Sequence, residues 1–241
     1  MTALRKIIIS LTVFSIAMGF MEAAVVIYLR ELYYPKGFQF PLIPISPSIA
    51  VVEFLREAAT IIMLACIGIL AGKNTAQQFS FFLFSFAVWD IFYYVFLKLF
   101  LGWPESFFTF DILFLIPVLW VGPVLTPCIL SLTMILLTMI VVYFHERDLS
   151  VTINKREWLL MISGTVVVIL SFTLDYAAYV LQNGKSLWTP MSREELFNEV
   201  SKYIPQSFNW WLFAVGEGLI LGSIAVMILR HKKELCKRKA K

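Results

Sequence analysis

Charged residues are scarce in this sequence. Asp, Glu, Lys and Arg make up only 15% of its 241 residues, against about 25% in a typical soluble domain. Hydrophobic residues make up 60%, and the mean hydropathy is +0.82. Several apolar runs reach the roughly 20 residues that a helix needs to cross a hydrocarbon layer about 30 Å thick. A soluble fold would need more polar residues than this chain has to cover its hydrophobic core. We therefore predict a multi-pass membrane protein.

Cysteine and histidine are also scarce, which limits the chemistry. The three cysteines, Cys66, Cys128 and Cys236, are widely spaced, which argues against a disulfide framework or a zinc site. The two histidines, His145 and His231, lie at the ends of apolar runs, so a bis-histidine haem site is not expected. The chain has no H-E-x-x-H, G-x-S-x-G or P-loop motif. Metalloprotease, serine-hydrolase and P-loop chemistry are therefore not expected.

The apolar runs predict an all-α fold, a polytopic transmembrane helix bundle that forms a single domain over residues 1–241. Ser46 and Pro47 precede the second run and suit the N-cap and the first position of a helix. The six predicted spans cover about residues 7–29, 50–71, 78–101, 124–144, 158–181 and 208–230.

The distribution of positive charge predicts the orientation. With the N-terminus inside, the inner segments hold thirteen Lys and Arg residues and the outer loops hold five. Cytoplasmic loops carry such an excess, so both termini are predicted to be cytoplasmic. The basic tail, residues 231–241, would then meet the anionic headgroups of the lipid bilayer. Nucleic acid is not an expected partner, because this basic run directly follows a membrane span.

Two further segments on the outer side need a separate interpretation. Segment 105–122 is almost long enough for a seventh span, but that would place the two termini on opposite sides of the membrane. Pro117, Pro123 and Pro127 also disfavour a continuous helix there. We therefore predict a re-entrant or interfacial half-helix, with a seventh span as the alternative. Segment 192–204 has helical spacing of apolar residues and predicts an amphipathic helix on the outer membrane face.

Seven acidic residues fall in or beside the predicted spans, with only Arg56 and Lys98 to balance them. A charge at the centre of a membrane helix costs roughly 2.5–3.5 kcal/mol, so these side chains should face the interior of the bundle. Five of the acids lie in the outer halves of their spans, which predicts an outward-facing acidic pocket. Arg56 can neutralise Glu53 or Glu57 on its own helix. The candidate ligand-binding residues are Glu22, Glu53, Arg56, Glu57, Asp90, Tyr94, Asp111, Asp175 and Glu217.

The acids have two interpretations at this point. In the first they are structural and fix the packing of the helices. In the second they form a site, because acids outnumber bases and some carboxylates must be protonated or hold a cation. A carboxylate-only site would suit protons or a hard cation such as Mg²⁺, Ca²⁺ or Mn²⁺.

Three small residues, Ala214, Gly218 and Gly222, repeat every four positions in the last span. This spacing favours close helix packing and offers a face for contact between copies in an oligomer.

Three motifs in the middle third of the chain, WDIFYY (89–94), DILFLIP (111–117) and WVGPVLTP (120–127), resemble segments of an uncharacterised family of bacterial polytopic membrane proteins. The resemblance implies a location in the bacterial inner membrane. It implies no activity and therefore carries over no catalytic residues.

Three functions fit these observations. The first is binding or transport of a small cationic or polar solute in the acidic pocket, and the sequence favours it. The second is an enzyme for lipid headgroups or lipid-linked substrates, with Asp90 and Asp111 as acid and base or as metal ligands. The third is a non-catalytic subunit or assembly factor of a membrane complex.

Overall fold

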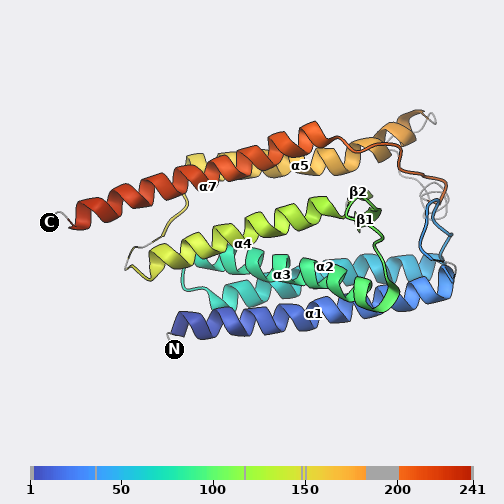
Figure 1. Ribbon diagram of the computed structural model, residues 1–241, viewed down its shortest axis with the longest axis horizontal. Coiled ribbons are helices and arrows are strands. Elements are labelled where there is room, and N and C mark those ends of the chain that lie inside the picture. The colour runs from blue at the N-terminus through green and yellow to red at the C-terminus, as the bar shows by residue number, and fades with distance from the viewer. Residues whose placement is uncertain are drawn as a thin grey trace.

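The computed structural model describes residues 3–35, 37–116, 118–147, 149, 151–182 and 201–239. Within this part of the chain the structure contains six long helices, and each is long and apolar enough to cross a membrane. The prediction of an all-α bundle with six spans is thereby confirmed (Figure 1). The helices are α1 (Ala3–Tyr33), α2 (Pro47–Ala71), α3 (Thr75–Leu101), α4 (Leu125–His145), α5 (Lys155–Gln182) and α7 (Trp210–Lys239).

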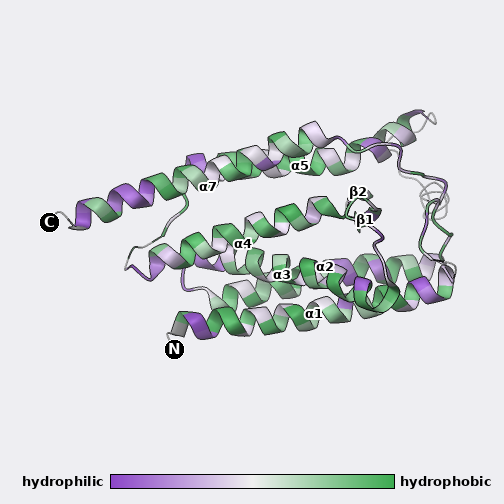
Figure 2. Cartoon of the chain, viewed as in Figure 1, coloured by the Kyte–Doolittle hydropathy of each residue, from purple (hydrophilic) through white to green (hydrophobic). Residues whose placement is uncertain are grey.

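Helix α3 is the centre of the larger part of the bundle, because α1, α2 and α4 all pack against it. Helices α5 and α7 pack against each other and are joined to the rest mainly through α4 and a short hairpin. Both termini lie at the same end of the bundle (Figure 1), as an even number of spans requires. Green hydrophobic residues run along all of the helices, and the C-terminal part of α7 is markedly hydrophilic (Figure 2).

Local sequence signals explain several helix ends. The Ser46 side chain accepts a hydrogen bond from the backbone N–H of Ile49 at 3.4 Å, and Pro47 occupies the first turn of α2, as predicted. The Asn74 side chain caps α3 in the same way through the Gln77 N–H. Helix α3 ends at Gly102, whose φ of 67° is a left-handed conformation that glycine adopts without a steric penalty.

The half-helix predicted over residues 105–122 is wrong, and so is the alternative of a seventh span. The segment instead forms an antiparallel hairpin of β1 (Phe110–Phe114) and β2 (Trp120–Pro123), in which Asp111 is paired with Gly122. The prolines prevent a continuous helix, and pairing the two strands satisfies backbone groups that a broken helix would leave without partners. The hairpin lies at the end of the bundle opposite the termini (Figure 1).

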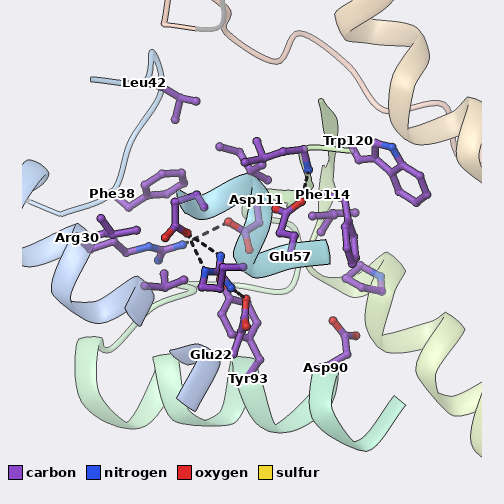
Figure 3. Close-up of a pocket in the computed structure, with 18 of the residues that line it drawn as sticks. Glu22, Arg30, Phe38, Leu42, Glu57, Asp90, Tyr93, Asp111, Phe114 and Trp120 are labelled. Carbon is purple, nitrogen blue, oxygen red and sulfur yellow. Dashed lines mark hydrogen bonds and ion pairs between the residues drawn. The ribbon is translucent and has the colours of Figure 1, made fainter. Parts of the chain in front are cut away.

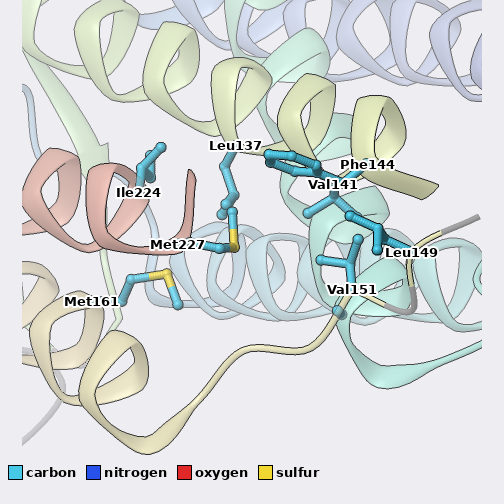
Figure 4. Close-up of a cluster of buried hydrophobic side chains, with 9 residues drawn as sticks. Leu137, Val141, Phe144, Leu149, Val151, Met161, Ile224 and Met227 are labelled. Carbon is cyan, nitrogen blue, oxygen red and sulfur yellow. The ribbon is translucent and has the colours of Figure 1, made fainter. Parts of the chain in front are cut away.

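A cluster of buried apolar side chains joins α4, α5 and α7 at the end where the termini lie (Figure 4). Val141 and Phe144 of α4 meet Met161 of α5 and Met227 of α7, with Val151 packed beside them. The space between these helices near the termini is therefore filled by side chains.

Two other predicted segments have different outcomes. The amphipathic helix predicted at 192–204 lies mainly outside the described residues, since 183–200 are not described. The basic tail that begins at His231 is not a separate segment, because α7 continues through it to Lys239.

The glycines of α7 divide between a packed face and an open face. A Cβ atom at Gly216 would lie 2.8 Å from the Gly164 carbonyl oxygen and 2.7 Å from Val168 Cγ2, so α5 and α7 are in close contact there. A Cβ at Gly218 or Gly222 would meet nothing within 4 Å. Close helix packing therefore occurs at Gly216, which lies on a different face of α7 from the predicted stripe of Ala214, Gly218 and Gly222.

We expect Gly216→Ala to lower the free energy of unfolding by about 1–3 kcal/mol, because the added methyl group meets backbone atoms of α5. Gly218→Ala is the matched control. It should leave stability unchanged or slightly higher, since alanine favours helix more than glycine does. Chemical unfolding of both variants in the same detergent checks this. Equal effects would contradict the described α5–α7 contact.

Candidate functional site

A cavity of ≈ 300 Å³ lies beside the hairpin, which Figure 1 places toward the end of the bundle opposite the termini. Its walls come from helices α1 to α4, the hairpin, and Phe172 of α5. Figure 3 shows charged side chains from different elements that point into the same space. Most of the predicted site residues share this cavity, namely Glu22, Glu53, Arg56, Glu57, Asp90, Tyr94 and Asp111, and Arg30 joins them.

Arg56 connects two acids from two helices. Its Nε and Nη2 atoms donate to Glu53 Oε2 at 2.9 and 2.7 Å, which confirms the predicted pair within α2. Its Nη1 atom donates to Glu22 of α1. Thr60 donates to the other Glu22 oxygen at 3.4 Å. One guanidinium therefore serves two carboxylates and ties α1 to α2.

A second ion pair, between Arg30 and Asp111, ties α1 to the hairpin. Arg30 Nη2 lies 3.3 Å from Asp111 Oδ1, and both side chains are buried. The Tyr94 hydroxyl of α3 donates to Asp111 Oδ2 at 3.2 Å. The guanidinium carbon of Arg30 also lies 3.7 Å from the Trp103 ring centroid and 4.3 Å from that of Phe38, an arrangement that stabilises a desolvated cation.

The surroundings of Asp111 act on its pKa in two directions. Burial raises the pKa of this carboxyl, whereas the Arg30 charge, the Ile112 N–H and the Tyr94 hydroxyl lower it. Arg30 and Tyr94 each bind one of the two carboxylate oxygens of Asp111, so this acid connects elements of the cavity wall.

Glu57 and Asp90 are different, because neither forms an ion pair with any of the described residues. Glu57 Oε2 accepts a hydrogen bond from the Leu115 N–H at 3.0 Å. Asp90 Oδ2 accepts one from the Ser131 hydroxyl of α4 at 2.8 Å. In Figure 3 the two acids enter the cavity from α2 and α3. These two carboxylates are the acids of the cavity whose charge is not balanced by an ion pair with a described residue.

Aromatic rings form the rest of the cavity wall. Phe86 of α3 stacks on Phe114 of the hairpin, with centroids 6.2 Å apart and an interplanar angle of 16°. Trp120 stacks on Phe172 of α5 at 6.1 Å and 15°. Trp89 completes this aromatic side of the cavity. The cavity thus combines carboxylates on one part of its wall with ring faces on another.

The connection between α1 and α2 forms another part of the cavity wall. Leu42, Ile43 and Pro44 line it, and Figure 3 shows Leu42 directed from this connection toward the cavity. The Ile43 N–H donates to the Tyr34 hydroxyl at 2.7 Å and fixes the connection to the end of α1. Burial raises the pKa of Tyr34, so this phenol remains neutral.

Two predicted site residues do not line this cavity. Asp175, in the C-terminal half of α5, accepts hydrogen bonds from the Tyr203 hydroxyl at 2.6 Å and from the Gln206 and Ser207 N–H groups at 3.1 and 3.3 Å. It fastens the segment that leads into α7. Burial raises the pKa of Tyr203, and Asp175 raises it further. Glu217 accepts a hydrogen bond from Thr133 between α4 and α7. The prediction placed both acids at the depth of the cavity acids, but each faces a different neighbour.

Arg30 is the charged cavity residue that sequence reasoning missed, since the first predicted span ended at residue 29. Helix α1 extends to Tyr33 and includes it. A local signal was present, because Arg30 lies eight residues after Glu22, about two helical turns further along α1. Its partner Asp111 is 81 residues away in sequence, and no local pattern predicts that pair.

The described residues contain no group of three or more His, Cys, Asp or Glu side chains placed to hold a metal ion. The predicted alternative of a directly coordinated hard cation therefore has no ligand set in this part of the chain, since Mg²⁺ and Ca²⁺ prefer six or more oxygens.

No protein-family model, curated protein or solved structure matches this chain. The interpretation of the cavity therefore depends on its own geometry.

We expect Asp111→Asn to lower the free energy of unfolding by about 3 kcal/mol or more, because Arg30 would remain buried without a counterion. Adding Arg30→Met to that variant should recover part of the loss. Denaturant unfolding of the two single variants and the double variant gives the coupling energy. Glu31→Gln, an exposed acid on the same helix end, is the control. Strictly additive losses would mean that the pair is not coupled.

Proposed function

We propose that this protein is a bacterial inner-membrane protein that binds a small organic cation in the cavity. The observation that carries the proposal is the position of Glu57 and Asp90, two carboxylates without a cation partner among the described residues, in a cavity whose other wall is aromatic. Carboxylates attract a positive group, and ring faces attract both a cation and the apolar body attached to it.

The charge balance of the cavity supports a cationic ligand. Five carboxylates and two guanidinium groups line it. Arg56 and Arg30 are already bound to Glu22, Glu53 and Asp111. A ligand cation would compensate charge that these two arginines leave unbalanced. A neutral ligand would leave Glu57 and Asp90 to be neutralised by protons alone.

The size of the cavity supports a small ligand. Its volume of ≈ 300 Å³ is at the lower end of the range of about 300–1,000 Å³ typical of small-molecule sites. A compact amine with one ring or a short alkyl group fits this space, whereas a lipid with two acyl chains is too large.

The orientation of the chain would open this cavity to the outside of the cell. The excess of Lys and Arg at the ends of the helices near the termini supports a cytoplasmic location for that end. The same end is filled by the buried cluster around Val141 and Phe144 (Figure 4). Another apolar cluster, around Leu11 and Phe84, packs α1 against α3. The proposal is therefore a binding site with access from the outer side.

The proposal of a lipid-headgroup enzyme is weakened by the position of Asp111. That hypothesis needs Asp90 and Asp111 as acid and base or as metal ligands. The two oxygens of Asp111, however, already accept hydrogen bonds from Arg30 and Tyr94. A subunit role remains compatible with the open glycine face of α7, which contacts nothing within the described part of the chain at Gly218 and Gly222.

Binding of small amines to the purified protein tests the proposal. The panel consists of small organic cations from phenethylammonium down to tetramethylammonium. We expect isothermal titration calorimetry to detect binding of at least one of them. Phenethyl alcohol, which has the same ring without the charge, should bind at least tenfold more weakly. Native mass spectrometry of the protein as purified would show whether a cation of this class is already retained. The absence of both a bound cation and any binding within the panel would refute the proposal.

Substitution of the two unpaired acids gives the matching prediction. We expect Glu57→Gln and Asp90→Asn each to weaken amine binding about 10- to 100-fold, because a hydrogen bond to a charged group contributes roughly 1.5–3 kcal/mol. Glu31→Gln makes the same change of charge outside the cavity and should leave the affinity unchanged. Unfolding of both cavity variants would instead assign these acids a structural role.

A further inference from the structure

Glu217 of α7 is a buried acid that the proposed function does not use. Its side chain is enclosed between α7 and α4, and the residue is only 7% exposed. Thr133 of α4 donates a hydrogen bond to Oε1. The second oxygen, Oε2, is buried and has no hydrogen-bond partner among the described residues.

No charged group of the neighbouring helices is positioned to balance Glu217. In α4 the only residue that could be cationic is His145, at the helix end. In α5 no charged residue occurs between Glu157 and Asp175. In α7 the nearest cation is Arg230, thirteen residues later, which is about 20 Å along the helix axis. Arg230 is itself paired with Glu157.

This environment cannot sustain a carboxylate charge. A buried ionised group with no counterion and one neutral hydrogen bond is strongly unfavourable, and such groups take up a proton instead. A protonated carboxyl needs no counterion, and Thr133 can still donate to its carbonyl oxygen.

We propose that Glu217 is a proton-binding carboxyl in the interior of the membrane, separate from the acidic cavity. The two sites lie on different sides of α4. The Ser131 hydroxyl holds Asp90 of the cavity, and the Thr133 hydroxyl holds Glu217. Proton binding at Glu217 does not depend on a ligand in the cavity.

A hydrophobic carbodiimide reports this state directly. The protonated carboxyl transfers its proton to one carbodiimide nitrogen while its oxygen bonds to the central carbon. The adduct then rearranges to a stable N-acylurea, so the residue gains the mass of the whole reagent and loses no atom. Dicyclohexylcarbodiimide enters the apolar interior, whereas a water-soluble carbodiimide does not.

We expect dicyclohexylcarbodiimide to modify Glu217 in the intact protein at neutral pH, as located by peptide mass spectrometry. The rate should be nearly constant between about pH 6 and about pH 8. If Glu217 had the ordinary pKa of a glutamate carboxyl, about 4.3, its modification rate would instead fall about tenfold per pH unit over this range. The water-soluble reagent should leave Glu217 unmodified. Glu217 should still form the dicyclohexylcarbodiimide adduct in the Glu57→Gln and Asp90→Asn variants. This result distinguishes the proposal for Glu217 from the proposal for the cavity.

Infrared spectroscopy gives a second readout that does not require reagent access. The spectrum at neutral pH should contain a protonated-carboxyl band that disappears in Glu217→Gln, whose neutral amide preserves the shape of the acid. Thr133→Val should shift that band, because it removes the hydrogen bond to Oε1. The proposal is overturned if no band responds to either substitution, or if the carbodiimide rate falls tenfold per pH unit.

Discussion

The cost of placing a charge in a low-dielectric membrane is the constraint on which the rest of this structure depends. Each acid within the bundle must find a cation, a hydrogen-bond donor or a proton. Arg56 meets this requirement for Glu22 and Glu53, and Arg30 meets it for Asp111. Because their partners come from different elements, these pairs also hold α1, α2 and the hairpin around a common space.

The cavity follows from how these charges are distributed. Two arginines cannot neutralise five carboxylates. Glu57 and Asp90, which form no ion pair with a described residue, face the same cavity beside a wall of stacked aromatic rings. That pairing of unbalanced negative charge with ring faces is complementary to an organic cation. Glu217 Oε2 is buried without a partner among the described residues, so the same constraint leads there to a bound proton.

The hairpin shows how a backbone constraint can override the hydropathy of a segment. Residues 105–122 are apolar enough to suggest a helix, but their prolines prevent one. Strand pairing supplies the missing hydrogen-bond partners, and it places Asp111 opposite Gly122. The absence of a side chain at Gly122 allows Phe172 of α5 to approach closely. The hairpin thus brings both an acid and an aromatic wall to the cavity.

The sequence by itself determined the features that depend on residues close together in the chain. Long apolar runs specified six spans, Ser46 and Pro47 specified the start of α2, and the spacing of Glu53 and Arg56 specified an ion pair on one helix. These follow from the helical repeat and from the cost of leaving backbone or charge unsatisfied.

Only the tertiary structure decided which acids share a cavity. Arg30 and Asp111 are 81 residues apart, as a helix end and a hairpin strand, and their contact depends on how α1 and the hairpin pack. Asp175 and Glu217 were predicted to lie at the depth of the cavity acids, yet they face other neighbours. Depth in a membrane follows from position along a single helix, whereas the direction in which a side chain meets another helix depends on how the helices are rotated and paired.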